Sequence, residues 1–313
     1  MKWYSAIIVM VLLALTACED KPSITRSGSL VLTGITSAKG SEMVTIDLDS
    51  GYVSTTPVNC HILSSTVYDP NTGGYGYVSC DTVFTLVDTE DGDIIRSIRL
   101  PGLISSAVID PGNNLLIGTY GEYEYIDDPD STNGATIPVF HTYLLTTDLE
   151  TGDIVLDKEF DLGDGVFLCT HFFDPVKKLY IFQRADNKLL LINPVTGTTT
   201  KTVDIGKPLI NVVYDTDKGN LISLVPASEP GICLIEVYKP TTGELISSKQ
   251  VTGIDSYHYC ICAYDPGTKC YLAVNSDNEV MFIDPDTGII ANKVKLDYQL
   301  NDIRFLRKQA DSF

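Results

Sequence analysis

A short phrase of the type Asp-x-x-Thr-Gly recurs six times and constrains the fold of this chain more than any other feature. Its fullest copy is Phe282-Ile-Asp-Pro-Asp-Thr-Gly288, and the other five end at Gly51, Gly92, Gly152, Gly197 and Gly243. Each copy stands between two apolar runs, as the tip of a β-hairpin does. The glycines are spaced by 41, 60, 45, 46 and 45 residues. Strands that repeat with a period of about 45 residues predict a β-propeller.

A second phrase, two apolar or aromatic residues followed by Asp-Pro, precedes five of the hairpin tips. Its first copy is Val67-Tyr-Asp-Pro70, and the others end at Pro111, Pro175, Thr216 and Pro266. Proline fixes φ and aspartate accepts backbone N–H groups, so the phrase predicts a turn between two strands. Each unit then forms one blade of four antiparallel strands, with the Asp-Pro turn between its first two strands and the glycine turn between its last two.

The units predict six blades closed into one ring. The first unit lacks a first strand of its own, and the isolated strand Leu300-Asn-Asp-Ile-Arg-Phe305 can supply it. Pairing both ends of the chain in one blade removes exposed sheet edges. The predicted blades span 28–58 with 298–306, then 62–100, 104–160, 168–205, 209–251 and 258–296.

The phrases Asp204-Ile-Gly-Lys-Pro208 and Val274-Asn-Ser-Asp-Asn278, together with the glycine tips, resemble the YVTN repeat family of quinoprotein-like propellers. The resemblance spans nearly the whole chain after its N-terminus and implies a propeller, more often of seven blades, so seven is the alternative count. Quinoprotein dehydrogenases of this class carry tryptophan motifs in each blade. The single tryptophan, Trp3, lies in the N-terminal apolar segment, so the resemblance does not extend to that activity.

The N-terminus predicts export and lipid attachment. Lys2 precedes a short apolar run, and Leu15-Thr-Ala-Cys18 resembles the bacterial lipobox, in which the cysteine is acylated. We expect a signal peptide at 1–17, a lipidated tether at 18–27, the propeller at 28–306 and a tail at 307–313. The acidic residues after Cys18 resemble the export signal of Bacteroidota lipoproteins. The expected location is the cell-surface side of the outer membrane, with a periplasm-facing anchor as the second choice.

Charge excludes one class of partner. The chain has 22 Lys and Arg against 41 Asp and Glu, a net charge of −19. Such a chain repels phosphate backbones, so we expect no nucleic-acid partner. The repeated aspartates of the glycine turns are predicted to be structural, since Asn193 and Lys239 replace them in two units. A metal ligand would not survive replacement by lysine.

The 60-residue spacing marks an insert, expected as a long loop over 120–139 on the face opposite the two kinds of turn. It carries the candidate binding residues Tyr120, Tyr123, Tyr125, Asp127 and Asp128. Tyrosines offer amphipathic contact area, and the acids favour a basic partner or a cation. Three interpretations stay open: a binding lid, a solvated acidic loop without a partner, and a calcium site.

The links between blades bring further candidates to the same face. These are His61, Tyr257, His258, Tyr259 and Tyr298. They form either an aromatic rim around the central channel, suited to a flat ligand, or a plug between blades.

Cysteines and acids offer two weaker sites. His258, Cys260 and Cys262 alternate along one predicted strand and would face one side, but no zinc spacing supports a metal site. Cys169 and Cys260 occupy equivalent positions in two blades, which predicts buried thiols. Asp255, Asp297, Asn301 and Asp302 lie near the predicted channel mouth, as the acids of calcium-dependent lactonases do.

The sequence therefore predicts a non-catalytic surface lipoprotein that binds a small ligand or a partner protein, such as an outer-membrane transporter, on the face of the insert. No cofactor, catalytic residue or metal ligand is assigned. The alternative is a calcium-dependent hydrolase of lactonase type.

Overall fold

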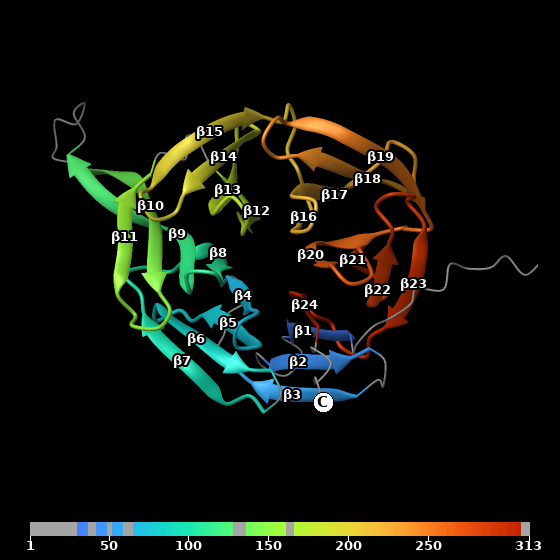
Figure 1. Cartoon of the computed structure of the whole chain (residues 1–313), viewed down its shortest axis with the longest axis horizontal. Coiled ribbons are helices and arrows are strands. Elements are labelled where there is room, and N and C mark those ends of the chain that lie inside the picture. Colours follow the sequence, from blue (N-terminus) through green and yellow to red (C-terminus); the bar gives the residue numbers. More distant parts are fainter. Residues whose placement is uncertain are drawn as a thin grey trace, which may run out of the picture.

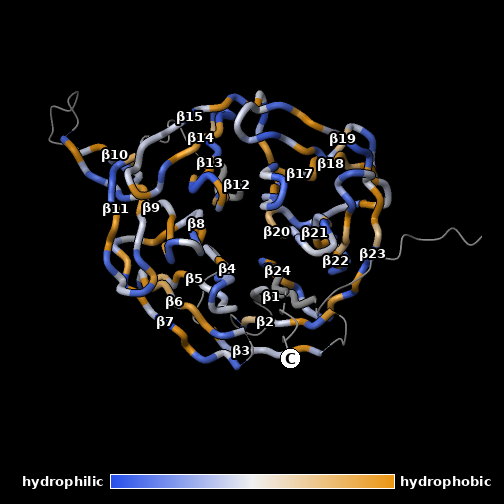
Figure 2. The backbone as a smooth tube through the Cα atoms, viewed as in Figure 1, coloured by the Kyte–Doolittle hydropathy of each residue, from blue (hydrophilic) through white to orange (hydrophobic). Residues whose placement is uncertain are grey.

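The computed structural model describes residues 30–36, 42–48, 52–58, 65–89, 91–127, 136–160 and 166–307, and these fold into a β-propeller (Figure 1). Regular structure within these residues is all β-strand, so the described part holds no helix that could cross a membrane. Hydrophobic residues occur on strands all around the ring (Figure 2). Strands in the middle of the sheets, such as Gly74–Val78, Lys188–Asn193 and Cys270–Asn275, are buried over most of their length, because each sheet packs between two neighbours.

The strands form six four-stranded antiparallel sheets. The first sheet contains β24 (Arg304–Arg307), β1 (Leu30–Thr36), β2 (Glu42–Asp47) and β3 (Val53–Pro57). The second contains β4 (Thr66–Asp69), β5 (Gly74–Val78), β6 (Val83–Asp88) and β7 (Ile94–Arg99). The third contains β8 (Ser105–Asp110), β9 (Leu115–Asp127), β10 (Thr136–Asp148) and β11 (Ile154–Glu159).

The other three sheets repeat this order without interruption. The fourth contains β12 (Val166–Asp174), β13 (Leu179–Arg184), β14 (Lys188–Asn193) and β15 (Thr198–Asp204). The fifth contains β16 (Val212–Asp215), β17 (Asn220–Pro226), β18 (Ile232–Lys239) and β19 (Glu244–Thr252). The sixth contains β20 (Tyr257–Asp265), β21 (Cys270–Asn275), β22 (Glu279–Ile283) and β23 (Ile290–Lys295).

The two ends of the described chain meet in the first sheet, where Leu30 of β1 pairs with Arg307 of β24. The C-terminal strand begins at Arg304 rather than at the predicted Leu300. Leu300 and Ile303 are buried, and Asp302 points its side chain at the second sheet, so this stretch is a packed link and not a strand.

The hydrophobic core lies between sheets. Six buried clusters exist in the described part, and each joins one pair of neighbouring sheets. Met43 of the first sheet packs with Tyr75 of the second, for example, and Val44 of the first packs with Phe282 of the sixth. The inner strands β24, β4, β8, β12, β16 and β20 also contact one another in cyclic order. Packing of this kind holds every sheet from both sides.

The glycine turns are structural, as their chemistry predicts. Gly288 has φ +78 and donates its N–H to the backbone oxygen of Asp284 at 2.8 Å. The Asp284 carboxylate accepts the N–H of Asp286 at 2.9 Å. The fifth sheet keeps the same backbone bond, from Gly243 to Lys239 at 2.9 Å. The turn therefore survives loss of the carboxylate because glycine supplies the positive φ.

The Asp-Pro turns also behave as predicted. Their aspartates, Asp69, Asp110, Asp174, Asp215 and Asp265, are at most 2% exposed. Each accepts the N–H group two residues later at 2.8 to 3.0 Å. These hydrogen bonds compensate burial of the charge.

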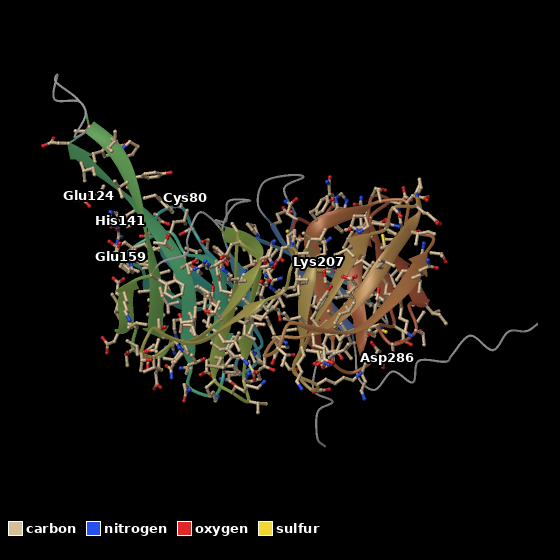
Figure 3. The ribbon with its side chains drawn as sticks, turned by 90° about the horizontal axis from the view of Figure 1, so that it is seen from above. Cys80, Glu124, His141, Glu159, Lys207 and Asp286 are labelled. Carbon is tan, nitrogen blue, oxygen red and sulfur yellow. The ribbon has the colours of Figure 1, made fainter. Side chains whose placement is uncertain are left out.

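The glycine and Asp-Pro turns lie at one end of the molecule, here called the turn face. Asp286, in the turn between β22 and β23, lies at this end, and Glu124 of β9 lies at the opposite end (Figure 3). The face at the opposite end is called the hairpin face below, because β9 and β10 extend from it.

Candidate functional site

The insert in the third sheet is a β-hairpin over its described residues, and its prediction as a loop was wrong there. β9 and β10 are 13 residues each, and they pair continuously from Leu115↔Asp148 to Asp127↔Thr136. The neighbouring strands are shorter, since β8 begins at Ser105, opposite Thr119, and β11 ends at Glu159, opposite Tyr143. The hairpin therefore projects as a two-stranded ribbon beyond the ring (Figure 1).

One surface of this ribbon is aromatic. Antiparallel pairing puts opposed residues on the same surface, so Tyr123 meets Phe140 and Tyr125 meets Pro138. The rings of Tyr123 and Phe140 lie 4.9 Å apart between centroids. Tyr123, Tyr125 and Phe140 are 67%, 69% and 56% exposed. Phe140 also covers Gly121, where an added Cβ would lie 2.1 Å from the ring.

The other surface carries an ion-paired histidine. His141 Nδ1 lies 2.6 Å from Oε1 of Glu159 on β11, and Nε2 lies 3.1 Å from Oε2 of Glu124 on β9. The second contact is at ion-pair distance but is not aligned as a hydrogen bond. The hydrogen bond to Glu159 raises the pKa of His141 above its ordinary value, against a smaller opposing effect of desolvation. The imidazole thus bridges the hairpin to the edge strand of the sheet, and its contacts become ion pairs when it is protonated.

Phe140 and His141 were absent from the candidate residues, although a signal for them exists. Glycine and tyrosine alternate with acids over Gly121–Tyr125, which is the pattern of a strand. In a hairpin, the segment that contains Phe140 and His141 would pair with this strand and place its own residues alternately on the same two surfaces. Only the register His141↔Glu122 and Phe140↔Tyr123 decides which residues share a surface.

Tyr120 differs from its expected role as a binding residue. It is 5% exposed, stacks on Tyr143 with centroids 5.0 Å apart, and donates its hydroxyl to Asp157 at 2.8 Å. Burial and this hydrogen bond raise the pKa of Tyr120. Tyr120 therefore anchors the root of the hairpin in the core. Asp127 is exposed at the end of β9, and Asp128 lies outside the described residues.

The predicted residues of the links gather on the sixth sheet. Tyr257 and Tyr259 lie 5.8 Å apart between centroids, and Tyr259 is 65% exposed. Tyr257 and His258 are half-buried, and Tyr298 packs against the core between the sixth and first sheets. His61 lies outside the described residues. The third and sixth sheets stand on opposite sides of the ring, so the hairpin and this aromatic group form two separate sites (Figure 1).

The expected alternation of His258, Cys260 and Cys262 fails because β20 is irregular. Its register to β21 shifts between Tyr257 and Cys262, and Cys260 has φ +63. Cys260 is disulfide-bonded, and burial raises the pKa of the Cys262 thiol to about 11. A neutral thiol and a disulfide are poor metal ligands. Among the described residues no group of three or more His, Cys, Asp or Glu is placed to hold a metal ion.

Cysteine 260 was expected as a buried free thiol, and the disulfide corrects this. Cys80, Cys233, Cys262 and Cys270 are free.

The acids considered for a lactonase do not converge in the structure. Asp302 accepts hydrogen bonds from Tyr75 at 3.0 Å and from Thr66, and it pairs with Arg304 at 2.8 Å. This carboxylate is committed to joining the first and second sheets. Asp255 and Asp297 are exposed, in different links.

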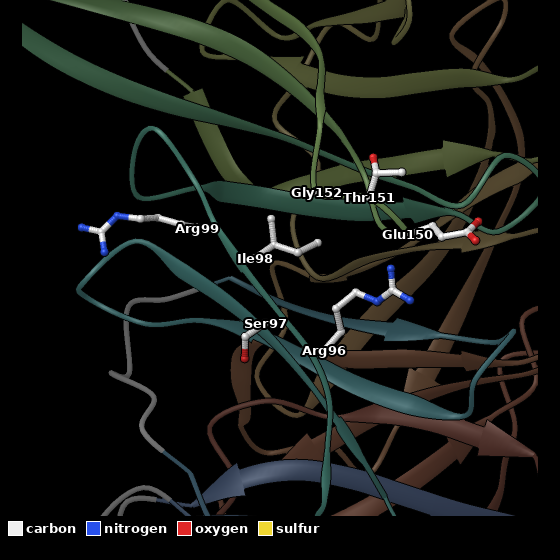
Figure 4. Close-up of a pocket in the computed structure, with 7 residues that line it drawn as sticks. All are labelled: Arg96, Ser97, Ile98, Arg99, Glu150, Thr151 and Gly152. Atoms are coloured by element: carbon white, nitrogen blue, oxygen red, sulfur yellow. The ribbon is translucent and has the colours of Figure 1, made fainter.

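A cavity of about 300 Å³ lies on the outer wall between β7 and the turn at Glu150–Gly152 (Figure 4). Arg96 extends toward Glu150 and donates a hydrogen bond to the backbone oxygen of Leu149, while Arg99 points away. The cavity thus lies between the second and third sheets, and the guanidinium of Arg96 beside it is already hydrogen-bonded to Leu149.

Comparison with known proteins supports the fold. No protein-family model matches the sequence, and no curated protein matches it either. The β-propeller domain of Cps50 (Swd1) from Myceliophteria thermophila is similar in structure, with TM-score 0.54 and 12% identity over 88% of this chain and 89% of that one. TolB from Acinetobacter baumannii is also similar, with TM-score 0.55 and 15% identity over 89% of this chain and 65% of that one. At such low identity these matches establish the β-propeller fold alone.

Proposed function

We propose that this protein is a non-catalytic, lipid-anchored propeller that docks a partner protein through the hairpin formed by β9 and β10. The observation that carries the proposal is the aromatic surface of that hairpin. Three rings on a two-stranded ribbon stay in water, although aromatic residues are the ones that protein interfaces bury most strongly.

The shape of the site favours a protein over a small ligand. Small molecules bind in concave pockets that enclose most of their surface, whereas this hairpin is a projection. Its charge favours a basic partner, because residues 120–142 include Glu122, Glu124 and Asp127 but no lysine or arginine. An outer-membrane transporter with a basic, apolar surface is a partner of this kind.

Three finer features belong to the same proposal. The ring has six blades, which the pairing of β1 with β24 and the six intersheet clusters support. Its repeats are of the YVTN type, which the phrase Val274–Asn278 supports. Cys18 carries the lipid at the outer membrane, which the lipobox-like residues support.

Photo-crosslinking tests the docking. The full chain carries a benzophenone amino acid at Tyr123, and a control carries it at Tyr259, which has similar exposure on the sixth sheet. After irradiation with membranes of the source cell, we expect one adduct from position 123 that Tyr125→Ala with Phe140→Ala removes. Adducts that form equally from position 259, or that persist in the double variant, would contradict docking at the hairpin. A Cys18→Ala chain that stays membrane-bound would contradict the anchor.

A further inference from the structure

Exposed apolar residues gather on the turn face as well as on the hairpin. Among the described residues 17 large apolar side chains are exposed: five on the hairpin, ten in or beside the turns, and Leu103 and Tyr259 elsewhere. Every sheet contributes to the turn face. One representative from each sheet is Tyr52, Ile94, Ile154, Val195, Leu245 and Ile289, with exposures from 48% to 69%. Single exposed aliphatic residues are ordinary, but a ring of them at one end of a molecule indicates a covered surface.

A repeated β-bulge contributes to this ring. In the second sheet Val87 pairs with Ile94 and Leu86 pairs with Arg96, so Ile95 is an extra residue. The same shift occurs between the last two strands of the third, fourth, fifth and sixth sheets. A bulge redirects side chains. It leaves consecutive aliphatic residues exposed at the start of an outer strand, such as Ile94 with Ile95, and Leu245 with Ile246.

The chain enters the propeller at this same end. Inner strands end on the turn face, as β4 does at Asp69 before its Asp-Pro turn. β24 is the inner strand of the first sheet, and its last residue, Arg307, pairs with Leu30 at the start of β1. β1 therefore begins at the turn face. The tether from Cys18 to Ser29 has 12 residues. Fully extended, it reaches about 40 Å, and as a flexible chain it spans about 20 Å on average.

The turn face is the nearer of the two faces for this tether. A strand of six residues, such as β7, crosses about 20 Å between the two faces. That distance alone equals the average span of the flexible tether. The free part of the hairpin, Gly121–Asp127, extends about 23 Å along its own length and slopes outward from the ring (Figure 1 and Figure 3). A propeller with its hairpin toward the membrane would therefore need the tether stretched beyond its average span, whereas one with its turn face toward the membrane would not.

We propose that the turn face lies against the membrane and that its ring of aliphatic side chains rests in the lipid headgroup layer, with the hairpin projecting outward. The inference rests on the proposed lipid anchor at Cys18. Asp91, Glu150 and Asp286 share this face with lysines of the Asp-Pro turns, and Lys218 pairs with Asp286 at 3.3 Å. Because these charges stay hydrated, the ring stays at headgroup depth. The orientation also leaves the aromatic surface of the hairpin free for a partner.

Fluorescence quenching tests the orientation. The full acylated chain, with a fluorescent amino acid at Ile154, Leu245 or Tyr125, is reconstituted in phosphatidylcholine–phosphatidylethanolamine vesicles that contain lipid with a nitroxide headgroup. We expect at least threefold stronger quenching at positions 154 and 245 than at 125. Equal quenching at the three positions, or stronger quenching at 125, would overturn the proposal. A chain that stays on the vesicles with no quenching at 154 or 245 would also overturn it and would indicate a protein as the occupant of the ring.

Two controls separate this proposal from the anchor itself. The mass of the Cys18 peptide and retention of the chain on washed vesicles report the anchor, so its failure is visible before any quenching is measured. Ile154→Asp with Leu245→Asp alters exposed positions and should leave the thermal transition unchanged. Both chains in this comparison carry Cys18→Ala and so lack the lipid. The chain with the two aspartates should bind the same vesicles at least threefold more weakly than the chain that keeps Ile154 and Leu245. Unchanged binding, or no binding by either chain, would count against lipid contact by the ring.

Discussion

Replacing Asp302 by alanine tests how the ring is closed. The Asp302 carboxylate accepts the hydroxyl of Tyr75 at 3.0 Å and that of Thr66, and it pairs with Arg304 at 2.8 Å. Arg304 in turn donates to the backbone oxygen of Thr66 at 2.8 Å. Asp302 lies in the link before β24, whereas Thr66 and Tyr75 belong to the second sheet. The cluster therefore links the residues before β24, the strand that completes the first sheet, to the second sheet.

The cost of losing this carboxylate follows from burial. Tyr75 is 0% exposed, and the Asp302 and Arg304 side chains are 14% and 29% exposed. Removing one partner of a buried ion pair costs about 3–5 kcal/mol. Water can reach Arg304 in part, so we expect Asp302→Ala to lower the free energy of unfolding by about 2–3 kcal/mol. For a chain of this size that corresponds to a fall in Tm of about 5 °C.

Urea unfolding followed by tyrosine fluorescence measures the change. Asp297→Ala is the matched control, because Asp297 is exposed in the same link and should change the free energy by less than about 0.5 kcal/mol. Tyr75→Phe removes only the hydroxyl and should cost about 1 kcal/mol. If Asp302→Ala proves as stable as Asp297→Ala, the cluster does not hold the closure and the reasoning fails.

Three further perturbations test other parts of the structure. Lys239→Asp adds the carboxylate that Asp284 provides in the sixth sheet and should stabilise the chain by about 0.5–1 kcal/mol in urea unfolding; destabilisation would contradict the turn chemistry. The pKa of His141 is raised in the folded chain, so its bridge is fully present below about pH 6.5 and is lost as pH rises through that raised value. The groups that face His141 are carboxylates on β9 and β11 and Tyr143. Hydrogen exchange of the β10 amides should therefore become faster with rising pH by more than the intrinsic exchange rate does. His141→Gln should remove this additional pH dependence. Cys260→Ser should raise the number of titratable thiols in the unfolded chain by one, since it frees the disulfide partner, and a fall by one would show that no disulfide forms.

Local chemistry explains which predictions succeeded. A glycine at positive φ and an aspartate that accepts nearby N–H groups act within five residues, so both kinds of turn are readable from the chain. Since turns delimit strands, the repeat also gave the limits of each sheet to within a few residues. Tyr123 and Tyr125 were candidate binding residues because the spacing of 60 residues isolates their segment, and their role in binding stays a prediction.

Predictions that depended on partners distant in the chain fared differently. Tyr120 looks like its neighbours Tyr123 and Tyr125 in sequence, yet it is buried because it packs in the core between the second and third sheets, where it stacks on Tyr143 and reaches Asp157. Cys260 looks like one of an alternating set, yet a shift in register removes the alternation.

The sequence by itself determined the repeating strand unit, the positions of the turns and the place of the insert, because each depends on contacts within one blade. The tertiary structure alone decided that the insert is a ribbon with an aromatic surface and an ion-paired surface, since pairing register sorts its residues. It also decided that the turn face carries a ring of aliphatic side chains where the chain enters. Bulges in five sheets and closure of the ring contribute to that arrangement, and neither has a signal in any single stretch of sequence.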